Sequence, residues 1–191
     1  MAVATLNLRR FVSTSDEFYE LCQENPDLEL ERTASGEVII MSPAGGETGA
    51  SNLSIGARLY NWNEEHELGI AFDSSTGFTL PNGAGRSPDA AWIAIERWNR
   101  LSAEQKQKFP PLAPDFVIEL RSSSDRMQIL RDKMEEYINN GVRLGWLIDS
   151  QSRTVEIYEP GEAVETLYNP DFVAGDPVLP GFVLNMKKVW G

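Results

Sequence analysis

Two acidic residues and one lysine have the types and spacing that could do chemistry. Asp89 follows Pro88 at the start of an apolar segment, and Glu119 lies inside the apolar run 116–120. A charge within such a run is costly to bury unless something pairs with it, so Glu119 predicts either a reactive site or an ion pair. Lys133 lies downstream at the edge of a helical apolar stripe, from which its ammonium can turn toward the sheet.

The carboxylates of Asp89 and Glu119 suit a divalent cation if they come from neighbouring strands. Such a cation is held by carboxylate oxygens, lowers the pKa of a bound water and offsets charge on a phosphodiester. Lys133 would then position that water or stabilise the transition state. Asp115 is no partner for Glu119, because four residues along one strand separate them by roughly 13 Å. Arg121, on the same face as Glu119, suits a phosphate clamp better than a base.

The elements that must position these residues alternate between strands and helices. Residues 96–109 form a polar helical excursion between two core strands, and the unit that holds Glu119 and Lys133 is strand, helix, strand. The pattern predicts a mixed α/β sheet flanked by helices, with an N-terminal helix and hairpin. Strands are expected over 28–32, 37–41, 70–73, 77–80, 87–95, 115–121, 142–149 and 154–158.

Two helices carry more detailed expectations. The helix of about 47–67 has apolar residues on two sides, which predicts packing on both. One side comprises Leu53, Gly56, Ala57 and Tyr60, and the other Ile55, Leu59 and Trp62. For the helix that carries Lys133, we expect Ser123 or Ser124 as the cap and Asp125 in the first turn, where the helix dipole favours negative charge.

Length and composition limit the classes of function. The 191 residues predict a single domain over 1–191. The lone Cys22 cannot form an intramolecular disulfide, which favours a cytoplasmic setting, and one His with one Cys argues against zinc chemistry. No segment approaches about 18 uninterrupted apolar residues, so no membrane partner is expected. The net charge of −12 argues against broad nucleic-acid affinity, so any such function needs a local basic site, metal ions or a partner.

The motifs in their order resemble a known nuclease superfamily. Pro88-Asp89, followed by Glu119 about thirty residues later, is similar to the PD-(D/E)xK restriction-endonuclease-like pattern. The whole set resembles the Uma-type family of bacterial proteins regarded as restriction endonucleases, over about residues 15–190. The other segments that carry the resemblance are Gly36-Glu37-Val38-Ile39, Ser42-Pro43, Phe116-Val117-Ile118-Glu119-Leu120, Ser124-Asp125, Lys133-Met134-Glu135-Glu136-Tyr137 and Gly145-Trp146-Leu147-Ile148-Asp149.

This resemblance implies a restriction-endonuclease-like fold and a Mg²⁺ or Mn²⁺ site at Asp89 and Glu119. It also implies that Lys133 is the catalytic lysine, because the superfamily's usual lysine position holds Arg121, which we assign to substrate binding. The implied function is an endonuclease that hydrolyses phosphodiester bonds, with DNA expected as the substrate in preference to RNA. The alternative is a catalytically inactive module of the same fold, which binds or assembles, with a homodimer as its expected form.

The superfamily often adds an acid from the early helix region, for which Glu47 is our candidate metal ligand and Glu31 the next choice. Each candidate also has a structural reading. Asp89 would cap a loop, Glu119 would pair with Arg121 or Lys133, Lys133 would be an ordinary boundary lysine, and Glu47 would be an acid placed for the helix dipole.

Overall fold

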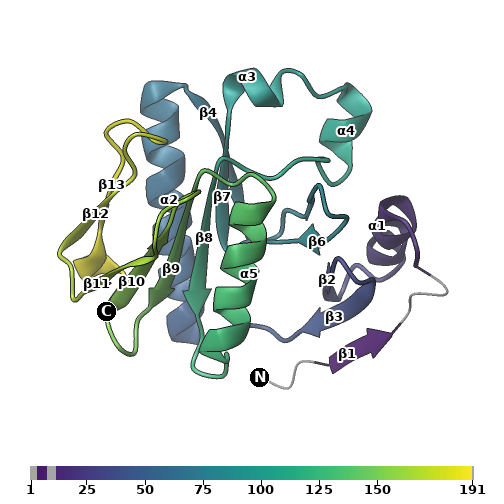
Figure 1. The fold of residues 1–191 in the computed structure, drawn as a ribbon, viewed down its shortest axis with the longest axis horizontal. Helices are drawn as coiled ribbons and strands as arrows, with labels where there is room; N and C mark the ends of the chain where they lie inside the picture. The colour runs from purple at the N-terminus through teal and green to yellow at the C-terminus, as the bar shows by residue number, and fades with distance from the viewer. Residues whose placement is uncertain (1–3, 8–11, 191) are drawn as a thin grey trace.

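The computed structural model describes residues 4–7 and 12–190, which contain a six-stranded sheet between two long helices (Figure 1). The strands of this sheet are β4 (Gly69–Asp73), β7 (Ala90–Ala94), β8 (Phe116–Arg121), β9 (Leu144–Asp149), β10 (Thr154–Tyr158) and β11 (Glu165–Tyr168). Their order is β11-β10-β9-β8-β7-β4. β8 and β9 are parallel, whereas the other neighbours are antiparallel. The predicted mixed α/β sheet with one strand-helix-strand unit is confirmed.

The helices α2 (Gly46–His66) and α5 (Met127–Asn139) cover opposite faces of this sheet (Figure 1). α2 buries one stripe only, formed by Ile55, Leu59, Trp62 and Asn63. Leu53 is 75% exposed and Tyr60 is 53% exposed, so the expectation of two packed faces was wrong. The reason is geometric: α2 is an outer layer, and among the described residues its partners lie on the side toward the sheet.

The start of α5 also differs from expectation. Arg126 is the N-cap residue, and no side chain in the described part of the chain caps the helix. Asp125 lies before the helix, where its carboxylate accepts the backbone N–H of Ser122 at 2.8 Å. The predicted serine cap was therefore wrong, because Asp125 closes the turn between β8 and α5 instead of lying in the first helical turn.

A second sheet lies beside α5 and brings distant segments to it. Its order is β1-β3-β2-β6-β5, and β2 and β3 form the predicted hairpin. The helix α1 (Ser15–Glu24) begins with a capping box between Thr14 and Glu17. The strands are β1 (Ala4–Asn7), β2 (Glu29–Arg32), β3 (Glu37–Met41), β5 (Phe78–Thr79) and β6 (Gly85–Arg86). β1 and β6 were not expected, and β6 matters most because it carries Arg86.

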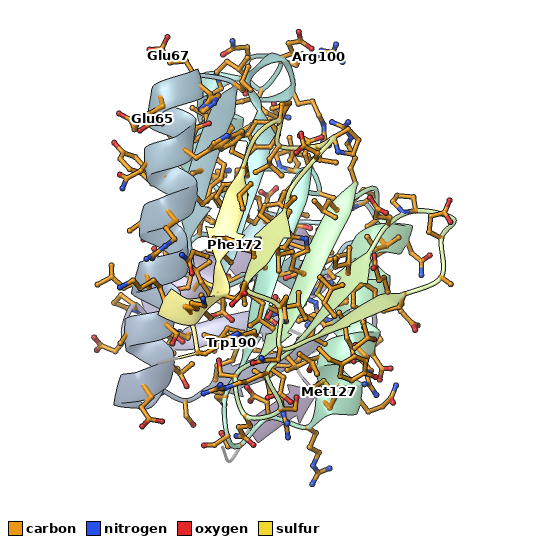
Figure 2. The ribbon with its side chains drawn as sticks, turned by 90° about the vertical axis from the view of Figure 1, so that its left-hand side faces the viewer. Glu65, Glu67, Arg100, Met127, Phe172 and Trp190 are labelled. Atoms are coloured by element: carbon orange, nitrogen blue, oxygen red, sulfur yellow. The ribbon has the colours of Figure 1, made fainter. Side chains whose placement is uncertain are left out.

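The C-terminal segment completes the layer on the α2 face. The hairpin of β12 (Phe172–Ala174) and β13 (Val183–Asn185), followed by the 3₁₀ turn η1 (Met186–Lys188), lies beside α2 on the same side of the central sheet (Figure 2). Phe182 stacks on Trp146 of β9 with ring centroids 5.9 Å apart. These short strands were not predicted, since few of their residues alternate clearly.

The polar excursion after β7 consists of two short helices, α3 (Ile95–Trp98) and α4 (Ala103–Gln107). No helix in the described part of the chain is long and apolar enough to cross a membrane. The expected single domain over 1–191 includes positions 1–3, 8–11 and 191, which lie outside the described residues.

Candidate active site

Asp89 and Glu119 meet at the same end of two adjacent strands. In the antiparallel ladder of β7 and β8, Ala90 pairs with Ile118, so Asp89 lies one residue beyond this pair, level with Glu119. The backbone N–H of Leu120 donates to Oδ2 of Asp89 at 2.7 Å. Because Leu120 directly follows Glu119, this bond fixes the two acidic positions next to each other.

Lys133 reaches this pair from α5. Its Nζ lies 2.8 Å from Oε1 of Glu119 and 2.8 Å from Oε1 of Glu31. Tyr137, one turn later on α5, donates its hydroxyl to the same Oε1 of Glu119 at 2.9 Å. The Lys133 side chain is only 10% exposed, so its ammonium and the two carboxylates form a buried ion triad. Such charges persist out of water only when they are paired in this way.

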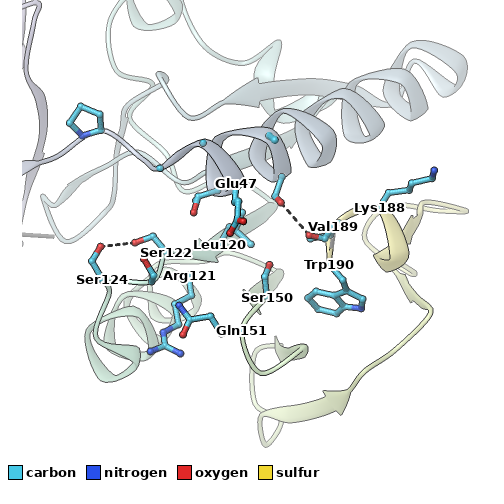
Figure 3. A pocket seen from close by; sticks show the side chains of 17 residues that line it. Glu47, Leu120, Arg121, Ser122, Ser124, Ser150, Gln151, Lys188, Val189 and Trp190 are labelled. Atoms are coloured by element: carbon cyan, nitrogen blue, oxygen red, sulfur yellow. Dashed lines mark hydrogen bonds between the residues drawn. The ribbon is translucent and has the colours of Figure 1, made fainter.

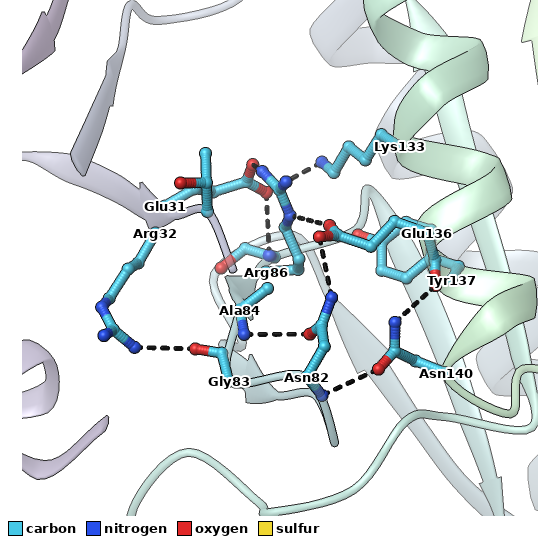
Figure 4. Close-up of polar contacts among 12 residues, drawn as sticks. Glu31, Arg32, Asn82, Gly83, Ala84, Arg86, Lys133, Glu136, Tyr137 and Asn140 are labelled. Carbon is cyan, nitrogen blue, oxygen red and sulfur yellow. Dashed lines mark hydrogen bonds and ion pairs between the residues drawn. The ribbon is translucent and has the colours of Figure 1, made fainter. Parts of the chain in front are cut away.

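Two further ions extend the triad (Figure 4). Arg86 comes from β6 of the second sheet, and Glu136 comes from α5. Nη1 of Arg86 lies 2.9 Å from Oε2 of Glu31, and its Nε lies 2.6 Å from Oε2 of Glu136. The backbone N–H of Ser87 adds a bond to Oε1 of Glu31 at 3.0 Å. We call the group Glu31, Arg86, Glu119, Lys133, Glu136 and Tyr137 the ionic cluster.

The two carboxylates that pair with Lys133 have pKa values shifted in opposite directions. Burial raises the pKa of Glu31, but Lys133 and Arg86 outweigh it and hold this pKa below its usual value. Burial also raises the pKa of Glu119, to about 7, because Lys133 only partly opposes it and the charges of Asp89 and Glu31 add to it. A proton taken up near neutral pH therefore goes to Glu119, while both carboxylates keep the pKa of Lys133 above its usual value in spite of burial.

Asp89 is held from its other side by α2. Nδ2 of Asn52 donates to Oδ1 of Asp89 at 2.7 Å, and both residues line a pocket of about 690 Å³ along this helix. Burial raises the pKa of Asp89, although the bonds from Leu120 and Asn52 oppose it. Within residues 4–7 and 12–190, no group of three or more His, Cys, Asp or Glu is placed to hold a metal ion. The oxygens of Asp89 and Glu119 are nevertheless the donors that Mg²⁺ and Mn²⁺ prefer.

Comparison with known proteins places this geometry in a family. The chain matches the family model Uma2, described as "Putative restriction endonuclease", over residues 15–187. The chain belongs to this family. A crystal structure from Anabaena variabilis, titled as "a putative nuclease belonging to DUF820", is similar in fold, with a TM-score of 0.76. It is 22% identical, and the match covers 93% of this chain and 97% of that one. Among curated proteins, none matches this chain.

Membership of the Uma2 family supports a nuclease-like function, and the structural likeness shows the fold. Within this family member, the carboxylate pair and Lys133 are brought together, whereas Arg121 is directed elsewhere. Nη1 of Arg121 lies 2.8 Å from Oδ2 of Asp149 at the end of β9. The ion pair of Glu119 is therefore made with Lys133 and not with Arg121.

Glu47 also lies apart from the ionic cluster. It is exposed in the first turn of α2 and lines a second pocket of about 870 Å³ (Figure 3). Arg121, Lys188 and the serine-rich turn after β8 line the same pocket, as does Leu120. Besides Glu119, the acid that reaches Lys133 is Glu31, which was the second choice for the additional metal ligand. A metal-binding role for Glu47 stays a prediction.

Four residues of the site were not predicted from the sequence: Tyr137, Glu136, Arg86 and Asn52. Tyr137 lies four residues after Lys133, and this helical spacing could have indicated that both face Glu119. Arg86 and Asn52 gave no comparable signal. Arg86 meets Glu31 across 55 residues of chain, and Asn52 meets Asp89 across 37, so neither contact has a local pattern.

Proposed function

We propose that this protein is an endonuclease that hydrolyses phosphodiester bonds in DNA with the help of Mg²⁺ or Mn²⁺. The observation that carries the proposal is the pairing of Asp89 and Glu119 at the ends of β7 and β8, with the ammonium of Lys133 2.8 Å from Glu119. Membership of a family described as restriction endonucleases supports the same class of reaction.

Each residue has a role that follows from its position. Asp89 and Glu119 would hold the cation, which supplies a water of lowered pKa and neutralises charge on the phosphate. Lys133 stays protonated and donates hydrogen bonds, so it suits stabilisation of the charge that develops on the phosphate oxygens. Tyr137 and Glu31 orient Glu119 and Lys133 for these tasks.

The second pocket supports a nucleic-acid substrate. Its wall carries Arg121 and Lys188 as its cations against the single acid Glu47, in a chain whose net charge is −12. Leu120 belongs to this wall and also bonds Asp89, so the pocket adjoins the carboxylate pair. A phosphate beside these cations would position the strand without a broadly basic surface.

The test is a cleavage assay on plasmid and single-stranded DNA with Mn²⁺ or Mg²⁺, with EDTA as the metal-free arm. We expect Asp89→Ala, Glu119→Gln and Lys133→Met each to lower the cleavage rate at least 100-fold, about the effect of deleting one transition-state contact. Glu135→Gln is the matched control, because Glu135 is an exposed acid two residues after Lys133. Cleavage that survives all three substitutions would assign the activity to another site or a contaminant.

One observation favours a second function, a non-catalytic module that binds nucleic acid or assembles. Glu119 is already engaged by Lys133 and Tyr137, an arrangement that would also be stable without any substrate. This function predicts DNA binding, or a homodimer, with no cleavage in any metal. Gel-shift and cleavage assays on the same preparation distinguish the two.

A further inference from the structure

Asn52 connects α2 to the carboxylate pair. It lies in the second turn of this 21-residue helix and donates Nδ2 to Oδ1 of Asp89 at 2.7 Å. Both residues line the pocket of about 690 Å³, together with Gly49 and Gly56 of the same helix. Asn52 is thus the residue by which the helix layer reaches the site.

The other end of this amide is unsatisfied. Oδ1 of Asn52 is buried, and among residues 4–7 and 12–190 it has no hydrogen-bond partner. A buried carbonyl oxygen without a partner is destabilising, so nearly all such atoms in folded proteins are satisfied. An orphaned oxygen next to an acidic pair points to a ligand that it would bind.

We propose that Oδ1 of Asn52 is a third protein ligand of the divalent cation that Asp89 and Glu119 hold. This inference rests on the proposed function, since it concerns the same cation. An amide carbonyl is a hard, neutral oxygen donor of the kind that Mg²⁺ and Ca²⁺ accept. It adds a ligand without adding a fourth negative charge beside Asp89, Glu119 and Glu31.

The position of the Asn52 amide beside Asp89 suits the coordination that such a cation requires. Neighbouring ligands of an octahedral Mg²⁺ at about 2.1 Å stand about 3 Å apart. Nδ2 of Asn52 lies 2.7 Å from Oδ1 of Asp89, and Oδ1 of Asn52 is bonded to the same amide carbon, so the amide oxygen is close to this carboxylate. Two carboxylates fill only a minority of the six positions, so a third donor from α2 has a place to occupy.

The first test is calorimetric titration of MnCl₂ into the full-length protein without nucleic acid. We expect Asn52→Ala to weaken Mn²⁺ binding at least tenfold and Asn52→Asp to bind as tightly as the wild type or more tightly. Asn61→Ala is the matched control, because Asn61 is an exposed amide on the same helix and pocket wall, and it should change the affinity less than twofold.

The aspartate variant separates a ligand from a positioning residue. If Asn52 acted only by donating to Asp89, then Asn52→Asp would lose that donor, bring two carboxylates together and weaken Mn²⁺ binding as Asn52→Ala does. That result would overturn the inference, as would Mn²⁺ affinity of Asn52→Ala within twofold of wild type. If Asn52→Ala fails to fold, the Mn²⁺ affinity of Asn52→Asp relative to wild type still tests the inference.

Crystals soaked in MnCl₂ give a second, direct readout. Anomalous scattering should place Mn²⁺ within about 2.3 Å of a side-chain oxygen of both Asn52 and Asp89. Mn²⁺ on Asp89 and Glu119, with Asn52 still donating to Asp89, would overturn the inference and leave the proposed function standing. A wild-type protein that binds no Mn²⁺ would instead remove the proposed metal-dependent function itself.

Discussion

The two faces of the central sheet bury different chemistry. The face under α2 is apolar, with Trp146 packed edge-on against Phe116 at 4.8 Å and stacked on Phe182. The face under α5 has an apolar cluster of its own, but it also encloses the ions of Glu31, Lys133 and Glu119. Burial of apolar area stabilises the first face directly, whereas buried charges cost desolvation that only complete pairing offsets.

The difference between the two faces indicates which of them carries the function. An apolar α5 face of similar volume would be at least as stable as the present one, because buried ion pairs seldom exceed well-packed apolar residues in stability. The ionic cluster is therefore better explained by what its charges do than by what they contribute to folding. The apolar cluster around Trp146 on the α2 face, by contrast, is explained by stability alone.

The largest expected effect is on the apolar face. Trp146→Ala should lower the free energy of unfolding by about 3–5 kcal/mol, because a fully buried indole leaves a cavity between Phe116 and Phe182. Urea unfolding at pH 8 in EDTA measures this. Trp146→Phe should lose less, since Nε1 of Trp146 has no hydrogen-bond partner within the described residues. Mn²⁺ affinity of the folded variant should stay near wild type, and a loss of affinity would show that the two faces are not separable.

The next effect is on the ionic face. Lys133→Met keeps the volume but removes the ammonium between Glu31 and Glu119, which should cost about 3 kcal/mol at pH 8. Urea unfolding measures it again. Adding Glu119→Gln to Lys133→Met should restore part of the stability, because Glu119 is the carboxylate left without its cation, whereas Glu31 keeps Arg86. Lys187→Met, at a 69% exposed lysine, is the control and should change stability by less than about 0.5 kcal/mol.

Within the ionic cluster, Glu119 and Glu31 should respond to pH with opposite signs. The raised pKa of Glu119, about 7 against 4.5, means that its contribution to stability is fully present below pH 4.5 and is lost as the pH rises through 7. Glu119→Gln keeps that contribution, so its stability relative to wild type should rise by up to about 3 kcal/mol between pH 4.5 and 8.

Glu31→Gln is the counterpart. Because the pKa of Glu31 is lowered, its contribution is present above pH 4.5 and is lost as the pH falls below that value. The glutamine variant should therefore be less stable than wild type at pH 8, and the deficit should shrink in acid. Urea unfolding of both variants in EDTA across pH 4–8 tests this, and parallel pH profiles would contradict the assignment of the proton to Glu119.

The sequence was enough to predict the central unit of the fold. The apolar run of β8, the stripe of α5 and the run of β9 are local patterns, so their order and parallel pairing could be predicted. The short β6, with two residues, has no periodicity to detect. Its place beside β2 follows from tertiary packing, which no window of sequence contains.

The residues of the candidate site likewise divide into those that local patterns predict and those that only tertiary packing brings together. Asp89, Glu119 and Lys133 could be singled out because each breaks a local apolar pattern or follows a known motif. Glu31 ranked behind Glu47 because the resemblance to the superfamily directs the additional acid to the early helix region. Only the second sheet, which turns β2 toward α5, shows that Glu31 is the carboxylate that meets Lys133.

The smallest expected effect concerns an ion pair on the same helix as Lys133. Nη2 of Arg131 lies 2.5 Å from Oε1 of Glu156, but the Arg131 side chain is 45% exposed. Arg131→Gln should therefore cost at most about 1 kcal/mol, because water solvates the guanidinium and Tyr158 still donates to Glu156. The wild-type advantage should shrink further in 1 M NaCl, where screening acts over about 3 Å, whereas the loss in Lys133→Met should persist. Equal salt sensitivity in the two variants would mean that water reaches Lys133 as freely as Arg131, and the contrast between a solvated and a buried ion pair on α5 would no longer hold.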